Sequence, residues 1–400
     1  MSQTRVAPAG ARDAHAVCRL GDRGAAVFDL RVALTSTGDA EAAGARPDQS
    51  IDPLVFDLPV QQAVRAFQQR RGLVADGVVG PETARALAAA RWRLGDRILA
   101  HIPGHLLHGD DVADLQSRLL GLGLGPDRVD AVFGPRTEAA VRDFQRGIGL
   151  PGDGIVGPDT LRGLAGLRRA VRGGNPHALR ERETLRRAGR SLVGRTILLD
   201  PGHGGPDLGC VANGVVEADL VLDLARRVEG RLLAQGVDVL FSRIHGDGGD
   251  ETVRSALAND LAADLVISLH CDAAAQAQAS GIATYYYGTD RFGAWSVVGE
   301  HLADLIQREL VARTGMIDCR SHARSWTLLQ RTEMPAVRVE VGHVSNPTDA
   351  ARLSDPALRD VMAEAIVVAI QRLYLGDEDS VRTGVFRLAE LRSFMADLAG

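Results

Sequence analysis

The apolar positions of the first 170 residues follow a helical period, and part of this pattern occurs twice. Residues 63–87 read AVRAFQQRRGLVADGVVGPETARAL, and residues 140–164 read AVRDFQRGIGLPGDGIVGPDTLRGL, at an offset of 77 residues and without a gap. In both copies Ala, Val and Phe at i, i+1 and i+4 place an apolar stripe on a helix. Asp-Gly then supplies a turn, and Gly-Pro starts the next helix. An internal repeat of helical units is therefore predicted.

An amphipathic helix precedes each copy, around residues 25–34 and 112–120, and a polar insertion of about residues 38–54 lies inside the first. These patterns predict two small all-α, three-helix domains. The predicted boundaries are a disordered N-terminus at 1–14, a first domain at 15–92 and a second domain at 105–168.

The remainder of the chain begins with an arginine-rich stretch, residues 169–194, which has no sustained apolar face and is expected to be a solvated helical linker. Short apolar strands then alternate with longer amphipathic helices over residues 195–375. This alternation predicts an α/β domain with a mixed sheet flanked by helices. Residues 376–400 are expected to form a tail that ends in a short helix, residues 386–398.

Polar residues follow several of the predicted strands. His203 lies in Asp-Pro-Gly-His-Gly-Gly after the first strand, Glu217 opens the first long helix, and His270 ends a later strand. Functional groups of α/β sheets gather at the carboxyl ends of strands. Two histidines and one glutamate form a familiar catalytic zinc set that leaves a fourth position open. Glu340 lies inside the apolar stretch VRVEVG, where an unpaired carboxylate is costly, so a nearby metal site would explain its position.

Composition narrows the possible chemistry. All 46 basic residues are arginine, which excludes a lysine-containing phosphate loop and Schiff-base chemistry. The net charge of -5 argues against a general nucleic-acid binder. The first 20 residues lack the apolar core of a secretory signal, and no segment has the length of a membrane helix. A cytoplasmic location is therefore expected, while export by a non-classical route stays open.

The repeat resembles the peptidoglycan-binding domain type 1 family through its AVxxFQxxxGLxxDGxxGxxT pattern. The resemblance implies a small helical module of the kind found beside cell-wall hydrolases. Each repeated residue is also explicable as core, turn or cap, so two interpretations stay open: the copies bind glycan or peptide, or the motif maintains only the fold.

Residues 195–375 resemble the zinc-dependent N-acetylmuramoyl-L-alanine amidases of the amidase type 3 family. The similarity runs through LLDPGHGG, Ser242-Arg243, ISLH and PAVRVEVGHVSNPTD. It implies that His203, Glu217 and His270 hold Zn²⁺ and that Glu340 is the general base and acid. The implied reaction is hydrolysis of the amide between N-acetylmuramic acid and L-alanine of the stem peptide. Asp200 is expected to orient His203 or a neighbouring backbone group.

Four residues, at three places in the chain, depart from the amidase family pattern. Ala218 replaces a lysine after the ligand glutamate, Cys271-Asp272 replaces Ala-Asn after His270, and His343 replaces a phenylalanine after Gly342. Cys271 is expected to be a packed side chain rather than an inhibitory thiol ligand.

The order of modules also resembles the actinobacterial CwlM type. Members of that type are implicated in cytoplasmic control of peptidoglycan precursor synthesis through the enolpyruvyl transferase MurA. Two hypotheses follow: a zinc amidase that acts on peptidoglycan or muropeptides, and a regulator that binds a cytoplasmic partner without hydrolysis.

Overall fold

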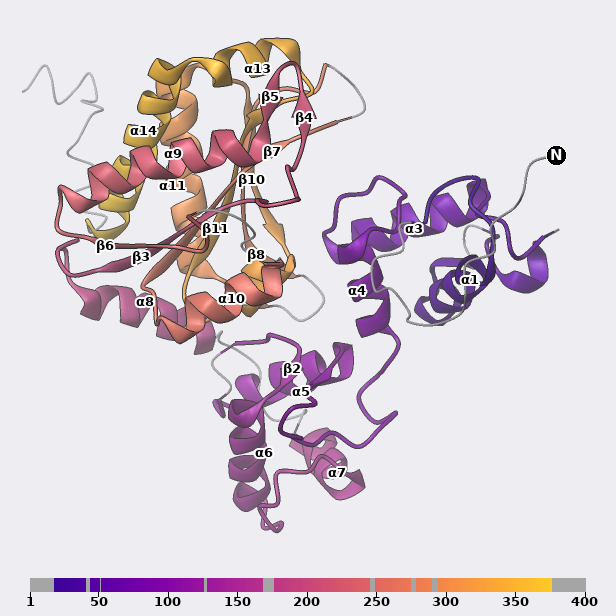
Figure 1. The fold of residues 1–400 in the computed structure, drawn as a ribbon. Helices are drawn as coiled ribbons and strands as arrows, with labels where there is room; N and C mark the ends of the chain where they lie inside the picture. Colours follow the sequence, from indigo (N-terminus) through magenta and orange to yellow (C-terminus); the bar gives the residue numbers. More distant parts are fainter. Residues whose placement is uncertain are drawn as a thin grey trace, which may run out of the picture. The chain divides into compact units, whose positions relative to one another are not determined.

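A computed structural model of the chain describes residues 18–40, 44–50, 52–125, 128–167, 176–244, 249–274, 278–289 and 294–375. The chain divides into two compact units, Met1–Arg172 and Gly173–Gly400, each described by itself (Figure 1). The predicted disordered N-terminus, residues 1–14, and the predicted tail with its helix, residues 376–400, lie outside the described residues.

The first unit is helical and contains both copies of the repeat. Its helices are α1 (Ala25–Thr37), α3 (Leu58–Arg71) and α4 (Pro81–Ala90) in the first copy, and α5 (Asp110–Gly121), α6 (Pro135–Gly147) and α7 (Pro158–Leu167) in the second. The 3-10 turn η1 (Pro47–Gln49) lies in the predicted insertion, and β1 (Leu107–His108) pairs antiparallel with β2 (Val132–Phe133). The predicted all-α class of this region is confirmed.

A buried glutamine explains the most regular part of the repeat. The Gln68 amide nitrogen lies 2.8 Å from Asp76 Oδ1, 2.9 Å from the Val78 carbonyl and 3.1 Å from Thr83 Oγ1, and its oxygen accepts from the Gly77 amide. One side chain thus fixes the Asp-Gly turn against two helices. Gln145 makes the same set of bonds in the second copy, with Asp153, Gly154, Ile155 and Thr160.

The same device occurs a third time, between α5 and α6. Gln116 Nε2 lies close to Asp130 Oδ1, the Val132 carbonyl and Thr137 Oγ1, and Gln116 Oε1 accepts from the Ala131 amide. Ala131 has φ of 61°, the left-handed conformation that glycine adopts at the equivalent turns. The repeated sequence pattern therefore reflects one hydrogen-bonded turn geometry.

The second unit is built around a seven-stranded mixed sheet with the order β10-β8-β11-β7-β3-β6 and with β9 paired to β8. Strands β3, β6, β7 and β11 run parallel to one another, whereas β8 and β10 run antiparallel to β11. The strands are β3 (Thr196–Pro201), β6 (Asp238–Phe241), β7 (Leu265–Asp272), β8 (Ile282–Thr289), β9 (Ala294–Trp295), β10 (Asp318–Arg324) and β11 (Ala336–His343). The predicted α/β class with a mixed sheet is confirmed.

Helices cover the sheet, and a small hairpin of β4 (Val211–Ala212) and β5 (Val215–Val216) precedes the first long one. The helices are α8 (Pro176–Ala188), α9 (Glu217–Leu233), α10 (Glu251–Asp260), α11 (Val297–Thr314), α12 (Thr327–Arg331), α13 (Pro347–Ser354) and α14 (Pro356–Tyr374). Helix α8 falls in the segment expected to be a linker, yet it belongs to this unit. Its Glu181 carboxylate accepts from Ser296 Oγ and the Val298 amide at the start of α11.

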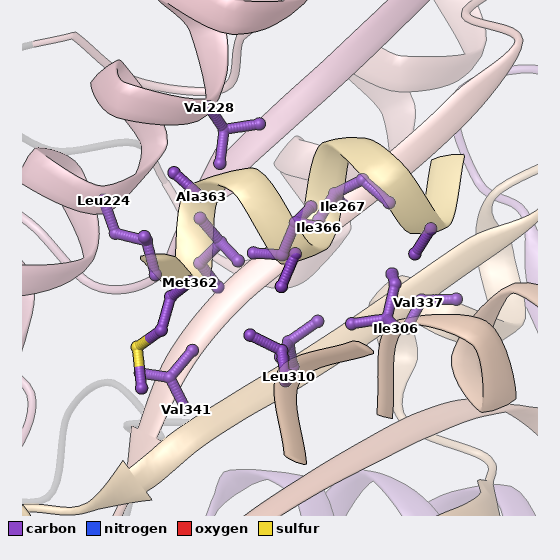
Figure 2. Packing of buried hydrophobic residues seen from close by; sticks show 14 of the residues in the cluster. Leu224, Val228, Ile267, Ile306, Leu310, Val337, Val341, Met362, Ala363 and Ile366 are labelled. Atoms are coloured by element: carbon purple, nitrogen blue, oxygen red, sulfur yellow. The ribbon is translucent and has the colours of Figure 1, made fainter. Parts of the chain in front are cut away.

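The two faces of the sheet differ in chemistry because side chains alternate along each strand. On one face Ile267, Leu269, Val337 and Val341 pack with α9, α11 and α14 in a single apolar core (Figure 2). On the opposite face the intervening residues of β7 and β11 are polar: Ser268, His270, Arg338 and Glu340. The apolar face supplies the burial that holds the sheet together, and the polar face carries the candidate site.

Replacing Gln68 by leucine should destabilise the first unit. The apolar side chain leaves the Gly77 amide and the Val78 carbonyl without their buried partner, which costs about 3 kcal/mol. Urea unfolding of the full chain, with hydrogen exchange followed over residues 58–90, measures the change. Gln69→Leu is the matched control, because Gln69 is the exposed neighbour on the same helix and should shift stability by less than about 0.5 kcal/mol. Equal effects of both substitutions would contradict the role of the glutamine.

Candidate metal and catalytic site

His203 reaches the site from the loop that follows β3. Its backbone is left-handed, with φ of 60°. Its Nδ1 lies 2.8 Å from Asp207 Oδ2, so the Asp207 carboxylate orients the ring and directs Nε2 toward Glu217 Oε1, 3.1 Å away. A carboxylate behind an imidazole fixes its tautomer and is typical of metal-binding histidines. Asp207 was not predicted; its only sequence signal is its position four residues after His203.

Glu217 is the first residue of α9, where the helix dipole favours a negative charge. Its two oxygens accept from the Cys210 and Cys271 amides, each at 2.9 Å. Burial raises the pKa of Glu217, but the hydrogen bonds to His203 and His270 outweigh it and hold that pKa far below its usual range. The side chain is therefore a fixed anion.

His270 completes the cluster from β7. Its Nδ1 lies 3.1 Å from the same Glu217 Oε1 that faces His203. Burial, followed by the nearby charge of Arg338, lowers the pKa of His270 to about 4, so the imidazole is neutral and has a lone pair to offer a metal.

The three predicted metal ligands thus converge. One ligand atom each from His203, Glu217 and His270 lies within 4.8 Å of the others. Ligands on a tetrahedral zinc lie about 3.3 Å apart at bond lengths near 2 Å, and the 3.1 Å distances from Glu217 Oε1 to His203 Nε2 and to His270 Nδ1 fit that spacing. The donor set suits a transition-metal ion such as zinc, and three protein ligands leave one position for substrate or water.

Two glycines are required by this packing. A Cβ on Gly202 would lie 2.1 Å from Cε1 of His270, and one on Gly209 would lie 2.6 Å from Glu217 Oε2. Gly209 also has φ of +66°, which disfavours a side chain in any case. The backbone approaches the ligand side chains too closely for any larger residue.

Glu340 lies beside His270, because the two residues are register partners of the parallel strands β11 and β7. The residue is 4% exposed, Oε1 accepts from Arg338 Nε at 2.8 Å, and Oε2 is buried with no hydrogen-bond partner among the described residues. Burial raises the pKa of Glu340 to about 7; the Arg338 charge opposes this shift, and Asp272 and Glu217 add to it. A carboxyl group that titrates near neutrality is suited to move a proton.

Arg338 is a further residue that the sequence interpretation did not single out. Besides Glu340, it pairs with Glu251 at 3.3 Å, and its guanidinium lies over the Trp326 ring at 4.6 Å. These contacts immobilise Arg338 and therefore fix which oxygen of Glu340 remains free. The only sequence signal was an arginine two residues before Glu340 in an otherwise apolar strand.

The expectation that the Asp200 carboxylate orients His203 or a neighbouring backbone group needs correction, because the partners of this carboxylate in the structure are other side chains. Asp200 accepts from Ser242 Oγ and Ser268 Oγ, each at 2.6 Å, and from Arg254 Nη1 at 3.2 Å. Burial raises the pKa of Asp200, but the Arg254 charge and the two hydroxyls bring it below its ordinary value. The link to His203 is indirect: Arg254 donates to the His203 carbonyl, while Asp207 contacts the ring.

The residues that depart from the family pattern lie around the cluster. Cys271 is buried in the apolar core on the far face of the sheet, and burial raises its thiol pKa well above the ordinary value. This position agrees with the packing role expected for it. The register shifts between Glu340 and His343, so that His343 pairs with Asp272, and their side chains lie 3.4 Å apart. A bulge of this kind redirects a side chain beside a site.

Comparisons with known proteins identify two families in the chain. A family model described as N-acetylmuramoyl-L-alanine amidase matches residues 197–372. A model described as a putative peptidoglycan binding domain matches residues 23–87 and 108–164. The two families inferred from the sequence motifs are therefore confirmed.

Individual relatives cover different parts of the chain. N-acetylmuramoyl-L-alanine amidase CwlM of Mycobacterium tuberculosis is 46% identical over 390 residues, which is 96% of each chain. N-acetylmuramoyl-L-alanine amidase LytC of Bacillus subtilis is 33% identical over 175 residues, 44% of this chain and 34% of LytC. The crystal structure of N-acetylmuramoyl-L-alanine amidase from Clostridium difficile 630 shares 27% identity, covers 46% of this chain and 97% of that chain, and has a TM-score of 0.43.

The chain belongs to the N-acetylmuramoyl-L-alanine amidase family and carries two putative peptidoglycan-binding domains. Within the part of the chain that the structure describes, none of the helices has the length and apolar character needed to cross a membrane.

The substitution Gly202→Ala should abolish tight metal binding. The added methyl group collides with the His270 ring, and the buried ring has no room to move without leaving Glu217. Metal content after dialysis against zinc measures the effect. Gly230→Ala is the matched control, because Gly230 is exposed in the middle of α9 and a Cβ there would meet nothing within 4 Å. This variant should keep the metal, and its free energy of unfolding should rise by about 1 kcal/mol because alanine favours the helix more than glycine does. Full metal content in Gly202→Ala would show that the close approach is not required.

Glu340 should make the stability of the metal-free protein depend on pH. Its folded pKa, about 7, lies above the ordinary value of 4.5, so its contribution is complete below about pH 4.5 and is lost as pH rises through about 7. Between about pH 5 and pH 8 the wild type should lose roughly 2–3 kcal/mol more of its free energy of unfolding than Glu340→Gln. Urea titrations in the presence of a chelator test this, with Glu333→Gln as an exposed control. Parallel curves for wild type and Glu340→Gln would refute the raised pKa.

Proposed function

We propose that this family member is a zinc-dependent amidase that hydrolyses the amide between N-acetylmuramic acid and L-alanine of peptidoglycan or muropeptides. The main support is the convergence of His203, Glu217 and His270 next to a buried, unpartnered oxygen of Glu340. Family membership supports the bond that is cleaved, and the donor chemistry supports zinc.

In this proposal His203, Glu217 and His270 hold Zn²⁺, and Glu340 is the general base and acid. Zinc, when bound, supplies Lewis acidity and makes water reactive at neutral pH. Glu340 takes a proton from the attacking water at Oε2, because Oε1 is held by Arg338, and delivers that proton to the nitrogen of the departing alanine. A raised pKa suits both halves of this transfer.

The neighbouring residues keep these groups in place. Asp207 orients His203, and the Cys210 and Cys271 amides orient Glu217, so that little reorganisation is needed when the ligands meet the metal. Asp200 acts one step further away, through Arg254. Ala218, which is buried directly after Glu217, contributes no charge at a position where the family commonly has a lysine.

The domain arrangement supports a polymeric substrate. We assign the modules at residues 15–92 and 105–168 to peptidoglycan binding, since the segments that match the family model, residues 23–87 and 108–164, fall within them. They would raise the local concentration of substrate at the amidase domain, residues 195–375.

Turnover of a muropeptide tests the proposal. After incubation with zinc, the purified full chain should retain about one zinc per chain. It should then release the L-alanyl peptide from a muropeptide, which mass spectrometry detects. Glu340→Gln should keep the zinc and lose at least about 100-fold in kcat. Glu333→Gln is the control, since that side chain is exposed and precedes the same strand.

A second result would favour the regulatory alternative. If the protein binds zinc but releases no peptide, and both wild type and Glu340→Gln bind the enolpyruvyl transferase MurA with equal affinity, the amidase proposal is wrong. Peptide release that depends on Glu340 rules out a purely non-hydrolytic role.

A further inference from the structure

Two buried arginines hold the backbone that carries the candidate metal ligands, although neither touches a ligand side chain. Arg243 follows β6, Arg254 lies in α10, and each is 6% exposed. Arg243 donates from Nε to the Pro201 carbonyl at 2.9 Å and from Nη2 to the Gly202 carbonyl at 2.7 Å. Arg254 donates from Nη2 to the His203 carbonyl at 2.8 Å. The carbonyls of three successive residues at the end of β3 and just after it, Pro201, Gly202 and His203, thus accept hydrogen bonds from guanidinium groups.

These bonds hold a conformation that the backbone would not favour alone. His203 is left-handed, which costs a residue other than glycine roughly 1–2 kcal/mol. A strained backbone conformation of this kind persists only where several contacts with the surrounding structure hold it in place. Arg254 contributes through the His203 carbonyl and, at 3.3 Å, through the Pro201 carbonyl. Asp200 in turn fixes Arg254 at 3.2 Å.

Arg243 also joins two ligand-bearing segments. The same Nη2 that binds the Gly202 carbonyl donates to the Ala218 carbonyl at 2.8 Å. Gly202 precedes His203, and Ala218 follows Glu217. The guanidinium therefore bridges the backbone beside one ligand to the backbone beside another, and so sets the spacing of these two segments without any metal.

Charge alone does not explain why the arginines are there. Two guanidinium groups close to one another repel, and burial together with the Arg254 charge lowers the pKa of Arg243. Two cations behind a metal site would also oppose a bound dication by Coulomb repulsion. Each arginine supplies a planar guanidinium group whose N–H donors have a fixed geometry, which suits backbone carbonyls that point in fixed directions.

We propose that Arg243 and Arg254 are positioning residues that assemble the metal site before the metal binds. This inference rests on the proposed function only in taking zinc as the metal. Loss of either guanidinium would leave carbonyls unpaired and free the His203 loop to move relative to Glu217. The site would then have to be ordered at the expense of binding free energy.

Zinc affinity of the full chain, measured by competition with a chromogenic chelator, tests this. Residues that orient metal ligands typically change affinity by about 10- to 100-fold, and a loss in this range is expected for Arg243→Gln and for Arg254→Gln. Arg231→Gln is the matched control: Arg231 is on the surface of α9, pairs with Asp360, and should bind zinc within about twofold of wild type.

Further variants separate positioning from charge and from general stability. Arg243→Lys keeps the charge but loses the planar set of guanidinium donors, so it should weaken zinc binding nearly as much as Arg243→Gln. If the glutamine variant does not fold, Arg243→Lys provides the test. Ile366→Val loosens the core on the opposite face by about 1 kcal/mol and should leave zinc affinity unchanged. Wild-type affinity in Arg243→Lys, or an equal loss in Ile366→Val, overturns the inference.

Hydrogen exchange of the metal-free protein gives a readout that is independent of both zinc and turnover. Arg243→Gln should expose the amides of residues 202–210 to faster exchange, while those of β7 stay protected. Unchanged exchange in residues 202–210 overturns the inference even if the enzyme is active. Conversely, if the wild-type protein binds zinc but does not cleave muropeptides, the proposed function is wrong, whereas this inference still holds.

Discussion

The carboxylate of Glu217 is the interaction on which the candidate site depends. It is buried at the start of α9, and a buried anion is tolerated only when its oxygens are fully paired. Two amides and two imidazoles supply those partners, from the segment before β4, from β7 and from the loop after β3. The partners in turn need their own positions fixed. Asp207, Gly202 and Gly209 are consequences of that requirement rather than separate features of the loop.

The comparison with Glu340 shows how one residue type acquires two roles. Both glutamates are almost fully buried, yet hydrogen bonds and imidazoles hold the pKa of Glu217 far below its usual range, whereas burial raises the pKa of Glu340 to about 7. The difference lies in the number of partners. Glu217 has donors on both oxygens, whereas Glu340 has one arginine on one oxygen. Environments that separate the pKa values of two carboxylates also separate a ligand from a proton carrier.

The sequence predicted the parts of the structure that depend on local pattern. The helix that starts at Glu217 and the buried strands β3, β7 and β11 have a clear apolar period. Strand β10 was not predicted, because an edge strand reading DCRSHAR buries little and carries no alternation strong enough to identify it. The docking of α8 also escaped prediction, because one glutamate that caps a distant helix leaves no periodic signal.

The same distinction applies to the candidate site. Residue type and place after a strand pointed to His203, Glu217, His270 and Glu340, and the structure brings the first three together with Glu340 beside His270. The partners of Asp200 could not be predicted in this way. They depend on register between β3 and β7, which places Asp200 opposite Ser268, and on an arginine that arrives from α10. Hydrogen bonds to backbone carbonyls leave no periodic signal in the sequence: Arg243 belongs to the Ser242-Arg243 motif, but the motif does not indicate which carbonyls it binds.

The absence of lysine acquires a structural meaning from the buried cations. Arg31 binds the Ala45 and Val55 carbonyls and the Asp57 carboxylate, and Arg243 binds three carbonyls. Each of these sites uses several donors held in one plane, while an ammonium group presents a single point charge on a flexible stem. At the surface, exchange of arginine for lysine changes little, since exposed ion pairs contribute roughly 0–1 kcal/mol. In the interior the guanidinium is required by the direction of the carbonyls it serves, so the arginines at these positions follow from the fold as well as from the composition.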